Sequence, residues 1–80
     1  MINVQFFARY REQLGCDSEQ VTGDFQTVEQ LRQHLLARGG AWQLLAEAGL
    51  MCACNQEMCA LDQVIKAGDE VAFFPTVTGG

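Results

Sequence analysis

The chain has 80 residues, which is enough for one domain with a small core. Its 49% hydrophobic and 19% charged residues exclude an intrinsically disordered chain. Ten acidic side chains against five basic ones give a net charge of −5, which repels phosphate backbones and excludes nucleic acid as the expected partner.

Apolar and polar side chains alternate from Ile2, which predicts a first strand over residues 2–8 with one buried face. Residues 9–14 have a mixed pattern that is typical of a short helical turn, and Gly15 ends it. Residues 20–22 predict a weaker second strand. The chain is therefore expected to begin with two strands joined by this short turn.

The next segment predicts the main helix. Thr27 is followed three residues later by Gln30, as in a capping box, in which the threonine hydroxyl satisfies an orphan N–H group. The apolar stripe of this helix consists of Val28, Leu31 and Leu35. Gly39 and Gly40 are expected to end the helix, and residues 42–49 predict a second, shorter one.

The last part of the chain predicts three more strands, over residues 50–54, 57–61 and 70–74. Tight turns are expected at residues 55–56 and 66–69. Pro75 has no N–H group to donate, so strand pairing should end there or continue only along an edge.

This order of elements predicts an α+β protein with a β-grasp fold, in which a mixed sheet packs on one main helix. The strongly apolar first and last strands are expected to lie in the middle of the sheet and to run parallel. We assign residues 1–75 to the folded domain and residues 76–80 to a flexible C-terminal tail.

The tail carries no charge and ends in Gly79 and Gly80. Five residues can extend about 15 Å, and glycines have no Cβ, so such a tail can thread a narrow channel. An α-carboxyl group has a pKa of about 3.5 and is a poor electrophile as the anion. We therefore expect Gly80 to react only after another enzyme activates its carboxylate, most simply by forming an acyl-adenylate from ATP.

Residues 1–8, 25–34 and 68–80 resemble the small, sulfur-carrier subunits of molybdopterin synthase. The resemblance covers essentially the whole chain, and its most specific part is the C-terminal stretch. It implies a ubiquitin-like β-grasp fold, in agreement with the order of elements. The family often has two prolines before the Val-Thr-Gly-Gly end, whereas here Thr76 follows Pro75, which we expect to loosen the root of the tail slightly.

The resemblance also implies a reaction cycle. An adenylyltransferase related to the ubiquitin-activating enzymes adenylates Gly80, and a sulfur donor converts the adenylate to a thiocarboxylate. The tail then enters the large catalytic subunit of molybdopterin synthase. There the sulfur passes to cyclic pyranopterin monophosphate, which gains the dithiolene of molybdopterin. Two transfers are needed, so the family complex is a heterotetramer with two small subunits.

A carrier of this kind must dock before its tail is inserted. Neighbouring residues of a strand point to opposite faces, so Phe6 and Phe73 in the core place Phe7 and Phe74 on the outer face. We predict that Phe7 and Phe74 form an apolar patch for the large subunit, unless this chain's own loops cover them. Arg9 and Arg11 follow the first strand and are expected to meet acidic groups of the partner, unless they are only solvated. The remaining predicted contacts are Pro75, Val77 and Thr78.

The cysteines allow two other readings. Cys52, Cys54 and Cys59 suggest a metal site, but Cys-x-Cys on a strand is not the usual zinc knuckle, and Cys16 and His34 belong to other elements. We expect the thiols to pack as small hydrophobic groups and predict no metal and no resident cofactor. A cysteine persulfide carrier is the second reading, although Cys52 and Cys54 have no basic neighbours in sequence that would lower their pKa.

The chain contains no apolar run of the ~20 residues that cross a bilayer, and its N-terminal residues do not read as a signal peptide. We therefore expect a cytoplasmic protein with reduced thiols. No catalytic set of side chains can be assembled, so the chain alone is not expected to be an enzyme. The alternatives are a sulfur carrier of thiamine synthesis, or a ubiquitin-like modifier whose adenylate meets an amine.

Overall fold

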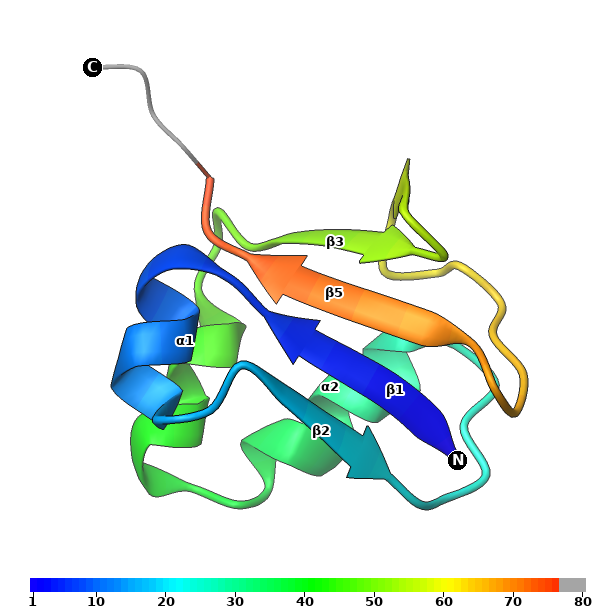
Figure 1. The fold of residues 1–80 in the computed structure, drawn as a ribbon, viewed down its shortest axis with the longest axis horizontal. Helices are drawn as coiled ribbons and strands as arrows, with labels where there is room; N and C mark the ends of the chain where they lie inside the picture. Colours follow the sequence, from blue (N-terminus) through cyan, green and yellow to red (C-terminus); the bar gives the residue numbers. More distant parts are fainter. Residues whose placement is uncertain (77–80) are drawn as a thin grey trace.

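The computed structural model of the chain describes residues 1–76, and Figure 1 shows its helices and strands. The strands are β1 (Ile2–Phe6), β2 (Ser18–Val21), β3 (Met51–Cys54), β4 (Glu57–Cys59) and β5 (Glu70–Phe74). The helices are α1 (Ala8–Leu14), α2 (Val28–Leu36) and the 3-10 helix η1 (Gly40–Ala46). Within residues 1–76, none of these helices is long and apolar enough to span a membrane.

The sheet formed by these residues has the order β2-β1-β5-β3-β4. β1 and β5 run parallel, and each other neighbouring pair is antiparallel. The first and last strands therefore lie side by side within the sheet, as Figure 1 shows, and the predicted β-grasp fold is confirmed. The predicted flexible tail comprises residues 76–80, of which residues 77–80 lie outside the described residues.

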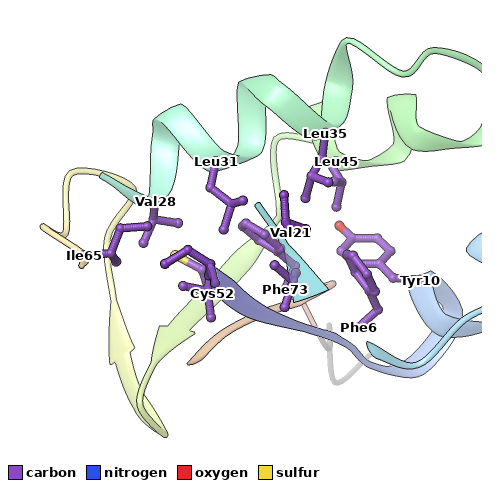
Figure 2. Close-up of a cluster of buried hydrophobic side chains, with 13 residues drawn as sticks. Phe6, Tyr10, Val21, Val28, Leu31, Leu35, Leu45, Cys52, Ile65 and Phe73 are labelled. Carbon is purple, nitrogen blue, oxygen red and sulfur yellow. The ribbon is translucent and has the colours of Figure 1, made fainter. Parts of the chain in front are cut away.

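The core lies between the sheet and α2 (Figure 2). Alternate residues of the central strands point into it, and the apolar stripe of α2 covers them from above. The fully buried side chains from these elements are Ile2, Val4, Phe6, Val28, Leu31, Leu35, Val71 and Phe73. Each large apolar side chain buried in this way contributes about 1.5–3 kcal/mol to stability.

The predicted start of the main helix is confirmed. The Gln30 N–H group donates to Thr27 Oγ1 over 3.2 Å, which satisfies one orphan donor of the first turn and stabilises the helix by about 1 kcal/mol. The reciprocal bond of the capping box is shifted by one residue. Gln30 Oε1 accepts from the N–H group of Gln26, over 2.7 Å, rather than from that of Thr27.

β4 ends at Cys59, whereas we expected a strand through residue 61. The reason lies at the N-terminus of α2, where backbone N–H groups need acceptors. The Glu29 N–H group donates to the Leu61 carbonyl over 2.9 Å, and the Val28 N–H group donates to the Gln63 carbonyl over 3.0 Å. The chain after Cys59 therefore leaves the sheet, and its carbonyl groups accept hydrogen bonds from the first turn of α2.

The first strand ends two residues earlier than predicted. Phe7 is still extended, and its N–H group donates to the Phe73 carbonyl over 3.2 Å, but Ala8 has a φ of 55° and turns the chain into α1. Gly15, with a φ of 76°, ends α1 as predicted. β2 begins at Ser18 because this residue pairs with Gln5, so the prediction of residues 20–22 was too late.

The second short helix is a 3-10 helix, and it begins at a residue that we expected only to end α2. Gly39 and Gly40 have φ angles of 75° and 57°, which reverse the chain and start η1 at once. η1 ends at Ala46, so the predicted extent of residues 42–49 was wrong at both ends. The following residues form a turn, in which the Leu50 N–H group donates to the Glu47 carbonyl over 3.2 Å.

Candidate functional site

The root of the tail is tied to the folded domain. Pro75, directly after β5, is buried. The Thr76 N–H group donates to the Gly49 carbonyl over 3.1 Å, and the Thr76 hydroxyl donates to the same oxygen. A second proline in place of Thr76 has no N–H group to give this bond. The expectation that Thr76 loosens the root is therefore wrong, because Thr76 anchors it.

Gly49 allows this approach because it has no side chain. A Cβ atom added at Gly49 would lie 3.0 Å from Thr76 Oγ1, closer than ordinary van der Waals contact. The bond joins residues that are far apart in sequence, so sequence patterns alone gave no indication of it. Residues 77–80 lie outside the described part of the chain, and with them the predicted site residues Val77, Thr78, Gly79 and Gly80.

The outer side of the sheet carries an apolar surface next to this root. Phe73 is fully buried, so Phe74 points to the other side, where it is half-buried. Phe74 pairs with Met51, Ala72 pairs with Ala53, and Ala53 pairs with Met58. We call this surface the outer apolar face, and it consists of Phe7, Met51, Ala53, Met58, Ala72 and Phe74.

Phe7 keeps 43% of its surface exposed, so the loops of this chain do not cover it. Met51 is 38% exposed and Met58 59% exposed, which gives the outer apolar face two flexible side chains that sequence analysis missed. Alternation within the strands could have revealed both residues. Met51 precedes Cys52 and Met58 precedes Cys59, so each methionine points away from the face on which its neighbouring cysteine lies. Large exposed apolar side chains gathered on one face are typical of a binding surface.

Arg11 and Pro75 were also predicted to meet a partner. Arg11 is exposed on α1 and lines the same shallow hollow as Phe7, together with Asp17. Its position fits a partner contact at the rim of the outer apolar face. Pro75 is already buried by this chain, so it offers a partner little surface.

Cys52, Cys54 and Cys59 lie on the core side of β3 and β4, whereas Cys16 lies between α1 and β2. Cys52 pairs with Cys59 across the two strands, with 3.7 Å between their sulfur atoms, and Cys52 Sγ donates to the Cys59 carbonyl over 3.3 Å. Residues 1–76 contain no group of three or more metal-ligating side chains arranged to hold an ion. Burial raises the pKa of Cys52 to about 12 and also raises that of Cys54, which argues against a persulfide carrier at either residue.

We expect Cys52 to resist alkylation. A shift of its pKa from 9.0 to about 12 lowers the thiolate fraction near neutral pH by roughly a thousandfold, and the thiolate is the nucleophile. Peptide mass mapping after a short treatment of the folded protein with iodoacetamide should find Cys52 unmodified, and unfolding in denaturant should remove the protection. Rapid labelling of Cys52 in the folded protein would contradict this interpretation.

Comparisons with known proteins agree with this architecture. Residues 4–80 match the ThiS family. The chain is 52% identical to the molybdopterin synthase sulfur carrier subunit of Escherichia coli and 49% identical to that of Haemophilus influenzae, in both cases over 100% of each chain. The crystal structure of SAMP1 from Haloferax volcanii superposes with a TM-score of 0.76 at 28% identity, over 99% of this chain and 98% of that one.

The family match covers nearly the whole chain, and each of the two relatives aligns with it over the full length of both sequences. The observed fold is the β-grasp fold that the resemblance implied, and its parallel central pair is the one predicted from the order of elements. This chain belongs to the ThiS family of β-grasp proteins, within which it groups with the molybdopterin synthase sulfur carrier subunits.

Proposed function

We propose that this chain is the sulfur-carrier subunit of a molybdopterin synthase. The observation that carries this proposal is the identity of about half of all residues, over the full length, with two proteins of that name. The terminal Gly79 and Gly80, which follow a root anchored on the folded domain, fit the same role.

In the proposed cycle, the carboxylate of Gly80 attacks the α-phosphorus of ATP in an activating enzyme, and pyrophosphate leaves. Hydrosulfide, or a donor that delivers sulfur at the same oxidation level, then attacks the carbonyl carbon of the acyl-adenylate, AMP leaves, and loss of the sulfur-bound proton gives a thiocarboxylate on Gly80. This species donates its sulfur to cyclic pyranopterin monophosphate in the large subunit, and water cleaves the acyl–sulfur bond, which restores the Gly80 carboxylate. An α-carboxylate is a poor electrophile, so the adenylate supplies the leaving group that the exchange requires.

The folded domain serves as the docking part of the carrier. The outer apolar face, with Phe7 and Phe74, meets the large subunit, and Arg11 contacts its rim. Pro75 supports the tail root, Val77 and Thr78 contact the large subunit, and Gly79 and Gly80 form the reactive end. The chain has no resident cofactor, performs no catalysis alone and works in the cytoplasm, where ATP reaches Gly80 only through the activating enzyme.

A second candidate is a protein modifier, because the chain also resembles SAMP1, a small archaeal modifier protein. The same adenylate would then react with a lysine amine of a target and form an amide. The identity to SAMP1 is 28%, against 52% to the Escherichia coli sulfur carrier, so the carrier function is favoured.

Intact mass spectrometry tests the proposal. After incubation with ATP, an activating enzyme and a sulfur donor, we expect the mass gain for replacement of one oxygen atom by sulfur, located on Gly80. Addition of the large subunit and cyclic pyranopterin monophosphate should return the carrier to its original mass and form molybdopterin. An amide bond to a lysine, with no thiocarboxylate at any stage, would favour the modifier function instead.

A further inference from the structure

The anchor of the tail root is itself held by a network that begins in α1. The Gly49 carbonyl, which accepts both bonds from Thr76, belongs to the turn over residues 47–50. This turn is closed by the bond from the Leu50 N–H group to the Glu47 carbonyl. Any movement of Glu47 therefore moves the acceptor on which Thr76 rests.

The side chain of Glu47 is bound by two donors from α1. Arg9 Nη2 donates to both carboxylate oxygens, over 2.6 and 2.5 Å, and the Tyr10 hydroxyl donates to Oε1 over 2.7 Å. The hydrogen bond from Arg9 has the larger effect, and the bond from Tyr10 adds to it. Together they hold the pKa of the Glu47 carboxyl below its usual value, so Glu47 is ionised near neutral pH. We call Arg9, Tyr10 and Glu47 the Glu47 clamp.

Tyr10 connects the clamp to the core. It is fully buried, and Figure 2 shows its ring among the core side chains, while its hydroxyl group reaches Glu47. The Arg9 guanidinium lies 5.3 Å from the centroid of the same ring. A rigid ring in the core, rather than a solvated surface pair alone, thus fixes the position of the carboxylate.

The same helix also carries part of the docking surface. Phe7 is the residue directly before α1, and its backbone is bonded to Phe73 of β5. The start of α1 therefore adjoins the outer apolar face at Phe7. One turn later, the same helix binds Glu47 and so connects this face with the tail root. A carrier that docks by one surface and reacts at a distant end needs a constant relation between the two.

We propose that the Glu47 clamp positions the tail: it holds the Gly49 carbonyl, and through it Thr76, so that the chain leaves the folded domain at a fixed place beside the outer apolar face. This inference rests on the proposed carrier function. The four residues after Thr76 can span only about 13 Å, so a displacement at the root reduces the fraction of docked carriers whose end group reaches the reacting atom.

The test combines Glu47→Ala with Tyr10→Phe, so that no buried hydroxyl is left without its acceptor. Tyr10→Phe alone controls for the ring, and Glu47→Gln retains an acceptor for the Tyr10 hydroxyl. The matched control is Glu19→Ala, which removes another exposed carboxylate bound by an arginine, here Arg38 over 2.9 and 2.5 Å, from a different part of the surface.

Hydrogen exchange of the Thr76 amide, followed by NMR in the full-length chain, is the first readout. We expect exchange to become several-fold faster in the double variant and to stay unchanged in Glu19→Ala. The second readout is sulfur transfer from the thiocarboxylated carrier to cyclic pyranopterin monophosphate in the large subunit. Here kcat should fall roughly tenfold while the Kd for the large subunit stays close to that of the wild type, and Glu47→Gln should restore part of the rate.

An unchanged Thr76 exchange rate in the double variant would overturn the proposal, and so would an equal effect of Glu19→Ala. Faster exchange with an unaltered kcat would also overturn it, because the anchor would then have no bearing on transfer. The exchange measurement requires no partner. If the wild type itself forms no thiocarboxylate, the carrier function fails, while the exchange rates still decide whether the clamp holds Thr76.

Discussion

A variant that lacks Gly79 and Gly80 should fold normally and support no molybdopterin formation. The deleted residues come after β5 and after Thr76, so the core and the root anchor are retained. The variant ends in Thr78, whose carboxylate cannot reach the position that Gly80 occupies in the proposed cycle, since each residue contributes about 3.3 Å of reach. Thermal unfolding checks the fold, and product formation with the complete enzyme set checks the activity.

Two further measurements make this result specific to the end group. A variant with one alanine added after Gly80 keeps every native residue, and it should lose activity to the same extent because the reactive carboxylate is displaced. Both variants should still compete with the wild type for the large subunit, because the outer apolar face is intact. Substantial molybdopterin formation by either variant would refute the role of the Gly80 carboxylate.

Replacement of Phe74 by alanine should weaken binding to the large subunit by about 2 kcal/mol, or roughly 30-fold in Kd, because aromatic side chains at the centre of an interface contribute most of its binding energy. Phe7→Ala should act in the same direction, and it changes a side chain that is already 43% exposed, so the fold should tolerate it. Isothermal titration calorimetry with the unmodified carrier measures both effects without the chemistry.

Val64→Ala is the matched control for these two variants. Val64 is 70% exposed and lies between β4 and β5, where it lines a hollow together with the loop before α2. The substitution therefore removes apolar surface without altering the outer apolar face. Its Kd should equal that of the wild type. If Phe7→Ala and Phe74→Ala bind as tightly as Val64→Ala, the docking surface lies elsewhere on the molecule.

Much of the fold follows from local patterns in the sequence. β5 was predicted with its observed bounds because its apolar residues stand between a turn and Pro75, both of which limit a strand. The main helix was predicted from the Thr27 cap and an apolar stripe. The errors arose where tertiary contacts decide: Leu61 leaves the sheet to accept a bond from the first turn of α2, which no local pattern reveals.

The candidate site divides in the same way. Alternation within a strand was enough to place Phe74 opposite the core. Residues 50–54 are all apolar or cysteine, so alternation shows which of their side chains share a face but not which face is buried, and the exposure of Met51 was missed. The anchor joins Thr76 to Gly49, which are 27 positions apart in the sequence, and the composition of the tail does not indicate this contact.

The place of β5 between β1 and β3 has a consequence for biosynthesis. A ribosome must have translated nearly the whole sequence before the strand that completes the centre of the sheet can leave the exit tunnel. Prematurely terminated products then lack a hydrogen-bonding neighbour for two strands and become substrates for proteases. Polypeptides that end before residue 74 cannot complete the centre of the sheet, so we expect proteases rather than an activating enzyme to meet them.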